Sequence, residues 1–393
     1  MPATDVAQGT ERNVYAFGAT SFFNDTASEM AYWVLPAFLA SIGAGPAQLG
    51  VIEGIAESIA SFAKLFSGVF ADRIQRRKPI VASGYVLANA VKPLLALTTS
   101  WWHVLGIRFA DRLAKGVRGA PRDVMLAEST PPGRVGSAFG LLQAMDSAGA
   151  IAGPLLALAI MPRFGLRAVF WAAAIPGALA IVAVLAFVKE RRSGAPKQTE
   201  EKKKKTTLPP AFYYVIFAVG LFSIGNSSDM FLVLRAQNVG IAAVHAPLLG
   251  LVFNVTYTLF SWPAGHWSDR ISRRGIAAAG LMVFATVYGV FAWAPSRGAI
   301  WSAMAVYGLY YALTGPVLKA IVSDAVPKES RGSAFGVFYF VTSVNTLLAS
   351  VLTGQLWTHF GARVAFTASA TLALIAGVML LMGSRSAAVE VGG

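Results

Sequence analysis

Residues 68–78 read GVFADRIQRRK, and residues 265–274 read GHWSDRISRR. Each stretch follows one long apolar run and precedes the next, so the two occupy matching places in the two parts of the chain. A further match lies at nearly the same offset, since GSAFG at 136–140 returns at 332–336. Matches at one offset predict a duplicated architecture in which each half is built in the same way.

The composition predicts that lipid covers much of the protein. The chain has 393 residues, of which 55% are hydrophobic and 13% are charged, and its mean hydropathy is +0.58. Soluble domains carry roughly 25% charged residues. So little polar surface cannot coat a water-soluble fold, and we expect an integral membrane protein.

Twelve apolar runs are long enough to cross the ~30 Å hydrocarbon layer as helices. Helices are expected because backbone polar groups in lipid must be satisfied within the segment, and the runs are too long for barrel strands. The predicted spans are 14–41, 47–71, 79–99, 101–127, 134–162, 167–189, 210–236, 244–268, 274–294, 298–324, 331–357 and 364–384. The predicted fold class is therefore an all-α membrane protein with two pseudo-symmetric six-helix bundles.

The predicted domains are residues 1–189, a cytoplasmic linker at 190–209, and residues 210–393. Residues 189–205 carry eight basic residues against three acidic ones, the one strongly polar interruption of the chain. Basic residues concentrate in cytoplasmic loops of membrane proteins. The basic loops fall on one side if both termini are cytoplasmic, so we predict a multi-pass protein of the plasma or inner membrane in that orientation.

The sequence also excludes several functions. It has no cysteine, which rules out disulfides and thiolate nucleophiles, and its four histidines show no metal-ligand spacing, so we expect no metal and no cofactor. No HExxH, GxSxG or Walker-type pattern occurs, so we do not expect an enzyme. The net charge of +14 lies in short segments between apolar runs, where membrane orientation explains it and nucleic-acid binding need not be invoked.

The segment Gly68 to Lys78 resembles the signature of the major facilitator superfamily between its second and third helices. The same pattern reappears at the matching place in the second half. The resemblance covers nearly the whole chain and implies a bacterial-type secondary transporter of twelve helices. In the family this cluster latches one conformation and releases in the other. By analogy, the residues assigned to gating are Gly68, Asp72, Arg73, Gly265, Asp269 and Arg270.

Two weaker family patterns follow. The residues Arg112, Lys115 and Gly116 resemble a family motif associated with proton coupling. The stretch GAIAGP at 149–154 resembles the motif of the family's antiporters, but Leu-Ala at 156–157 replaces its usual two glycines. Close packing of small residues and a proline kink explain GxxxGP equally well.

Six of the charged residues in the fourth predicted span stand out, since each is costly inside a membrane. At 100° per residue they occupy one face about 120° wide, so they must line an aqueous cavity or pair with acids on other helices. They are Arg108, Asp111, Arg112, Lys115, Arg118 and Arg122. Arg118 and Arg122 lie toward the cytoplasmic end, where gating is expected, and the others lie nearer the midplane.

Acids and polar residues of other spans are the expected partners of this face. A network of buried ion pairs without a ligand is the alternative for any one of them. Together with the midplane residues of the fourth span, the candidates for substrate binding or coupling are Asp25, Glu29, Glu53, Glu57, Asp146, Asn226, Asp229 and Lys319. Proton coupling needs a buried carboxylate that titrates near neutral pH. Glu29 is the first choice, because its repeat counterpart Asp229 is also acidic.

These observations predict a secondary transporter, coupled to protons, that moves a small anionic or zwitterionic organic solute by alternating access. We expect it to act as a monomer in the lipid bilayer. The alternative is a multidrug or cation–proton antiporter that uses the acids of the first two spans.

Overall fold

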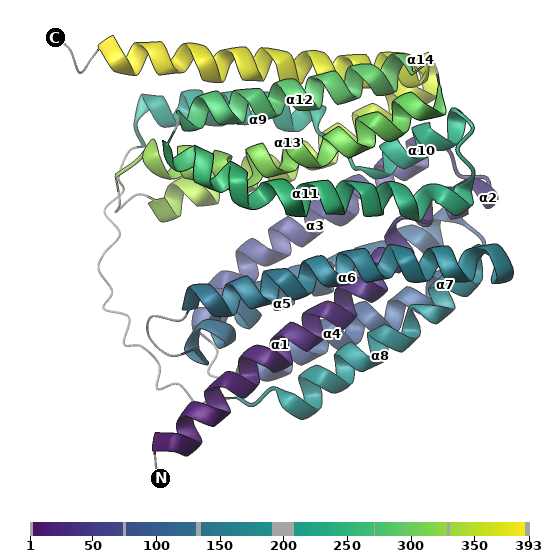
Figure 1. Ribbon diagram of the computed structural model, residues 1–393, viewed down its shortest axis with the longest axis vertical. Helices are drawn as coiled ribbons and strands as arrows, with labels where there is room; N and C mark the ends of the chain where they lie inside the picture. Colours follow the sequence, from purple (N-terminus) through teal and green to yellow (C-terminus); the bar gives the residue numbers. More distant parts are fainter. Residues whose placement is uncertain are drawn as a thin grey trace. The chain divides into compact units, whose positions relative to one another are not determined.

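The computed structural model describes residues 3–73, 76–130, 135–190, 208–270, 272–294, 296–327 and 331–389. Within these ranges the regular structure is helical throughout (Figure 1). The elements up to residue 190 are α1 (Ala3–Tyr32), α2 (Leu35–Ser41), α3 (Pro46–Arg73), α4 (Lys78–Val91), η1 (Lys92–Leu97), α5 (Trp101–Glu128), α6 (Val135–Phe164), α7 (Leu166–Ala172), α8 (Ala174–Val182) and η2 (Ala183–Phe187).

The second half repeats the pattern. Its elements are α9 (Pro210–Gly225), α10 (Met230–Asn238), η3 (Ala243–His245), α11 (Ala246–Arg270), α12 (Arg273–Trp293), α13 (Arg297–Asp324) and α14 (Arg331–Val389). Inside α14 the backbone leaves the helical region at Gly361, whose φ of 84° suits glycine. This break separates the last two predicted spans. The predicted fold of twelve helical spans is confirmed.

Two spans are each divided by a short break near the polar residues that they carry. The first span leaves the helix at residues 33–34, between α1 and α2, and Pro36 stands at the start of α2. The seventh span leaves it at residues 226–229, between α9 and α10. Broken helices expose backbone groups, which a membrane tolerates only where protein or a cavity satisfies them.

The chain divides into two compact units. Unit 1 comprises residues 1–43, 55–199 and 243–251, and unit 2 comprises residues 44–54, 200–242 and 252–393. In unit 1, α1 packs on α6 and α8, and α4 packs on α5. In unit 2, α14 packs on α9 and α12, and α12 also packs on α13. Most of the predicted linker, residues 191–207, lies outside the described residues.

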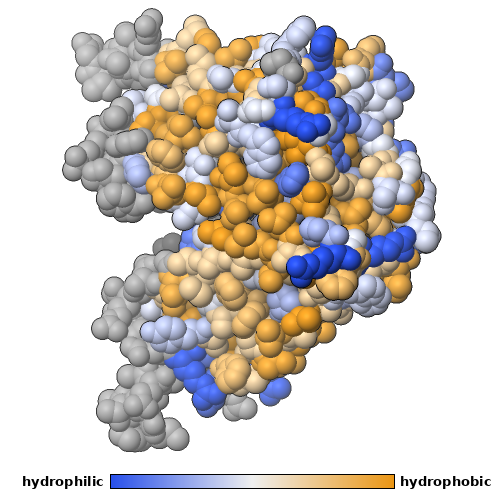
Figure 2. Space-filling model, turned by 45° about the vertical axis from the view of Figure 1, so that its right-hand side comes forward, coloured by the Kyte–Doolittle hydropathy of each residue, from blue (hydrophilic) through white to orange (hydrophobic). Residues whose placement is uncertain are grey.

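The surface of the helices is apolar, as expected for contact with lipid. Large hydrophobic side chains such as Phe164, Ile175, Phe217 and Leu259 are each more than 60% exposed. On the face shown in Figure 2, hydrophobic side chains cover broad areas of the surface. Water would disfavour so much exposed apolar area, so a bilayer is the solvent that fits it.

Length and composition alone identify eight stretches of the described helices as able to cross a membrane, and the last, residues 334–382, covers two predicted spans. The helices α1, α3 and α5 are not among them. These three carry most of the interior charges of the first half, which lower their hydropathy. The helices that look least like membrane spans are therefore those that build the candidate site.

Candidate functional site

The charged face of α5 points largely into the protein. Arg108, Asp111, Arg112 and Arg118 are each less than 9% exposed, and Arg122 is half-buried. Lys115 is exposed, yet it lies in the wall of a cavity. Because one face of the helix carries all of these groups, the chain hides five cations and an acid from lipid without breaking the helix.

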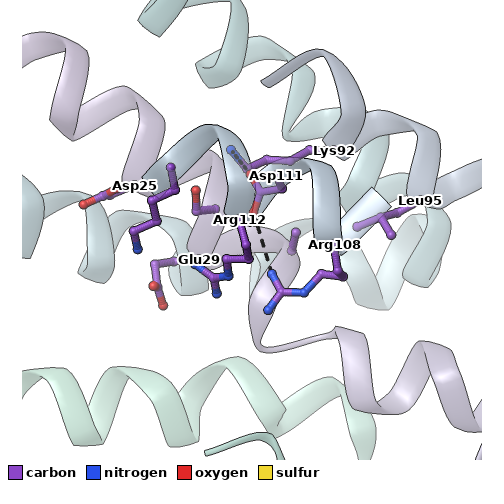
Figure 3. Close-up of a pocket in the computed structure, with 10 residues that line it drawn as sticks. Asp25, Glu29, Lys92, Leu95, Arg108, Asp111 and Arg112 are labelled. Atoms are coloured by element: carbon purple, nitrogen blue, oxygen red, sulfur yellow. Dashed lines mark ion pairs between the residues drawn. The ribbon is translucent and has the colours of Figure 1, made fainter. Parts of the chain in front are cut away.

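A cavity of about 60 Å³ opens beside this face in unit 1 (Figure 3). Its walls come from α1, η1 and α5. The lining residues are Asp25, Ser28, Glu29, Ala31, Lys92, Leu95, Arg108, Asp111, Arg112 and Lys115. A volume of this size holds a handful of water molecules. It would also hold one carboxylate or phosphate group, but not a whole drug-sized molecule, which needs several hundred Å³.

A chain of polar contacts crosses one wall of the cavity. Asn24 donates to Asp25 at 2.9 Å, and Asn89 donates to the Asn24 side-chain oxygen at 3.2 Å. Lys92 then donates to Asn89 at 3.1 Å and lies 3.4 Å from an oxygen of Asp111. This series of hydrogen bonds and ionic contacts therefore connects a carboxylate of α1 to a carboxylate of α5.

Asp111 is the centre of a buried ionic cluster. Besides Lys92, the guanidinium of Arg108 lies 3.8 Å from its other oxygen, as the dashed lines in Figure 3 show. The neighbouring Arg112 extends to α3, where it pairs with Glu57 at 3.0 Å. Buried charges are tolerated when they are paired in this way.

Glu29 lies on α1 at the side of the cavity and accepts a hydrogen bond of 2.7 Å from the indole nitrogen of Trp33, one turn later. Asp25 lies one turn before Glu29, so both carboxylates share one face of α1 and both line the cavity. The two acids and three cations of α5, Arg108, Arg112 and Lys115, therefore line one cavity.

Glycines of α6 and α5 determine how closely the helices approach here. A Cβ at Gly149 would lie 3.1 Å from the Asp25 Cβ, and a Cβ at Gly153 would lie 2.8 Å from the Glu29 Cβ. On the other side, a Cβ at Gly116 would lie 2.5 Å from atoms of α3. The GxxxGP pattern thus has the packing role that small residues have in membrane helices. It lets α1, which carries Asp25 and Glu29, pack closely against α6.

The predicted acidic residues of α3 separate into two neighbourhoods. Glu57 belongs to the ionic cluster of unit 1. Glu53, one turn earlier, is fully buried and accepts a hydrogen bond of 3.2 Å from the hydroxyl of Ser228 in unit 2. Their i, i+4 spacing predicts one shared face, but the structure gives them different partners.

Asp229 of unit 2 is surrounded by tyrosines. It accepts hydrogen bonds from Tyr307 at 2.7 Å and from Tyr311 at 3.1 and 3.3 Å. Asn226 is half-buried at the end of α9, whereas Lys319 is exposed on α13. Of the predicted candidates of the second half, Asp229 is therefore the one whose hydrogen-bond partners are described most fully.

The remaining candidates of unit 1 do not line the cavity. Asp146 of α6 is half-buried, and its Oδ1 has no hydrogen-bond partner among the described residues. The Arg118 guanidinium lies 4.1 Å from the centre of the Tyr85 ring, and Arg122 bonds to Asp123 and Ser21. The side chains of six predicted gating residues lie outside those that the structure describes: Gly68, Asp72, Arg73, Gly265, Asp269 and Arg270.

Two ion pairs near the signature loops were not predicted. Arg77 pairs with Glu128 at 2.7 Å in unit 1, and Arg273 pairs with Asp324 at 2.7 Å in unit 2. In both pairs the partners are 51 positions apart, and the pairs are related by the 196-residue offset of the GSAFG repeat. Each pair joins the start of the third helix of a half to the end of the fourth.

Sequence reasoning also missed Lys92 and the asparagines of the polar chain. A signal for Lys92 existed, because it is a lone lysine inside the predicted span 79–99. Asn24 and Asn89 gave no such signal, since single asparagines in membrane helices are not unusual. The tyrosines around Asp229 follow an i, i+3, i+4 pattern on α13 that could have indicated one face.

The fold and this site define a class: a multi-pass membrane transporter with a charged cavity among its helices. The family model of the Major Facilitator Superfamily matches residues 17–239 and 215–391. An uncharacterised MFS-type transporter of Methanocaldococcus jannaschii is 34% identical over 378 residues, 94% of each chain. The chain therefore belongs to the Major Facilitator Superfamily. It is a transporter of small molecules and not an enzyme.

Two further comparisons are more distant. The multi-drug resistance efflux pump PmrA of Streptococcus pneumoniae is 24% identical over 355 residues, which cover 83% of this chain and 85% of the pump. A solved peptide transporter in complex with alafosfalin has a TM-score of 0.79 at 14% identity and covers 98% of both chains. At that identity the likeness is one of fold alone.

Proposed function

We propose that this transporter moves a small organic anion together with protons, by alternating access of its two halves. The observation that carries the proposal is the cavity of unit 1, where four basic side chains converge on a space that fits one oxyanion group. Paired guanidinium and ammonium groups are the usual ligands of carboxylate and phosphate. Substrate sites near the midplane of such transporters are formed in this way by interior side chains.

The balance of charge supports proton coupling. Four cations and three acids line the cavity, and the carboxylate of Glu57, paired with Arg112, brings the cluster to formal neutrality. A neutral cluster has no net attraction for an anion. Protonation of one carboxylate, for which we propose Glu29, would leave one net positive charge, so proton and anion would each favour binding of the other.

We further propose that both termini face the cytoplasm, that the protein works as a monomer in the cell membrane, and that residues 1–189 and 210–393 are the bodies that move. Gating is assigned to the signature residues and to Arg118 and Arg122. The basic loops support the orientation, because lysine and arginine concentrate on the cytoplasmic side.

The test uses purified protein in detergent and in liposomes. Organic anions should raise the temperature of unfolding in a concentration-dependent way. Arg112→Gln should abolish this response, whereas Arg163→Gln, which removes an exposed arginine of α6, should leave it unchanged. In liposomes, Glu29→Gln should retain anion binding and lose the response of uptake to a proton gradient. Anion stabilisation that survives Arg112→Gln would contradict the proposed site.

A second candidate is a multidrug or cation–proton antiporter, and the likeness to the multi-drug resistance efflux pump PmrA favours the multidrug form. In that case lipophilic cations and not anions would stabilise the protein. The effect would then be lost in Asp25→Asn or Glu29→Gln and kept in Arg112→Gln. The same screen therefore separates the two functions.

A further inference from the structure

Asp229 does not act as a simple helix cap. It stands at the N-terminal end of α10, where an acidic side chain commonly binds free backbone amides. Its side chain makes no such hydrogen bond. Both of its oxygens accept instead from tyrosine hydroxyls of α13. The carboxylate is therefore held away from the helix end, in a position that the capping role does not explain.

The tyrosine hydroxyls stabilise negative charge at this position. Tyr307 donates to Oδ1 at 2.7 Å, and Tyr311 reaches both oxygens. Hydroxyl groups that donate to a carboxylate favour its charged form. Asp229 is half-buried, so part of the residue is accessible.

Aromatic rings make up much of the surroundings of this carboxylate. Tyr311 packs edge-on against Phe253 at 5.1 Å and against Tyr257 at 6.1 Å, measured between ring centres, and Tyr307 lies 5.5 Å from Tyr311. Both Tyr257 and Tyr311 are half-buried, so part of each ring is accessible. The faces of such rings carry negative electrostatic potential and attract cations.

A carboxylate beside accessible aromatic rings suits an organic cation better than a metal ion. Metal ions such as Ca²⁺ or Mg²⁺ take six or more oxygen ligands. No group of three or more metal-binding side chains occurs among the described residues.

We propose that Asp229 and the rings of Tyr257 and Tyr311 form a binding site for an organic ammonium group in unit 2. The carboxylate supplies the charge, and the rings contact the alkyl carbons next to the nitrogen. This site goes beyond the proposed anion function, because other residues, in the other unit, carry it.

The experiment measures binding of n-butylammonium chloride to the full-length protein by thermal unfolding, with potassium chloride at equal ionic strength as reference. The expected result is saturable stabilisation by butylammonium beyond that of potassium. Asp229→Asn keeps the shape and removes the charge, and should weaken the apparent affinity about tenfold or more. Asp324→Asn removes another carboxylate of the same unit and should leave the affinity unchanged.

Tyr257→Leu keeps the carboxylate and removes one ring. It should weaken butylammonium binding. If Asp229→Asn does not fold, the affinity of Tyr257→Leu for butylammonium is the test of the proposed site. Equal stabilisation by potassium and butylammonium, or an affinity that is unchanged in Asp229→Asn or in Tyr257→Leu, overturns the proposal. Stabilisation by anions, measured on the same samples, should persist in Asp229→Asn, so failure of this site and failure of the anion site are distinguishable.

Discussion

The substitution Gly153→Ala tests whether the contact between α6 and α1 positions the acids of the cavity. The added methyl group would lie 2.7 Å from the Thr26 carbonyl oxygen, 2.8 Å from the Glu29 Cβ and 2.9 Å from the Met30 nitrogen. Favourable carbon contacts begin at about 3.5 Å. The two helices must therefore separate by roughly 0.6–0.8 Å, which displaces Glu29 from the cavity wall.

Overpacking of this kind costs about 1–3 kcal/mol. For a unit of roughly 200 residues, that lowers the temperature of unfolding by about 2–12 °C. The matched control is Gly106→Ala on α5, where a new Cβ meets no atom within 4 Å. The control should unfold at or slightly above the wild-type temperature, because alanine favours helix. Both variants are compared by thermal unfolding in one detergent and by anion uptake. A Gly153→Ala protein with wild-type stability and uptake would refute the packing argument.

The remaining predictions concern buried charges and are read by thermal unfolding. Glu128→Gln should lower the free energy of unfolding by about 1–2 kcal/mol and Asp324→Asn by less than about 1 kcal/mol, because the pair of Glu128 with Arg77 is much more buried than that of Asp324 with Arg273. Equal losses of stability would contradict this prediction. Lys92→Ala should lower the free energy of unfolding by about 3 kcal/mol, and the double change Lys92→Met with Asp111→Asn should recover only part of it, because Arg108 then loses Asp111 as well. No recovery would show that the pair is not the cause. Tyr85→Leu should cost about 2 kcal/mol by removing the ring beneath a buried guanidinium, whereas Tyr85→Phe, which keeps the ring, should not.

Hydropathy and the internal repeat were sufficient to predict the helical architecture, since a span must be long and apolar whatever it packs against. The charged face of α5 was predictable for a related reason: a helix in lipid cannot scatter charges around its circumference. Asp25 and Glu29 line the same cavity as this face, but the acid of another helix that pairs with it is Glu57.

The choice of partners could not be predicted in the same way. Pairing depends on which helices are neighbours and on how far they are displaced along their axes. The periodicity of the sequence predicts neither. Glu53 and Glu57 show this, because they share a helix face and yet bind a serine of unit 2 and an arginine of unit 1. The tyrosines around Asp229 were missed for another reason: most aromatic residues in membrane helices pack or face lipid, so their number carries little information.

The repeat preserves the arrangement of helices in each half but not the residue types at the candidate sites. The Arg77–Glu128 pair has its counterpart 196 positions later, at the same distance of 2.7 Å. At that offset, however, the charged positions 111 and 115 of α5 correspond to Tyr307 and Tyr311 of α13. In the two sites that we propose, paired cations of one unit suit anionic groups, whereas the carboxylate and tyrosines of the other suit cationic ones. The duplication therefore supplied equivalent positions on matching helices, and the residues that now occupy them differ in charge and in the ligands that they suit.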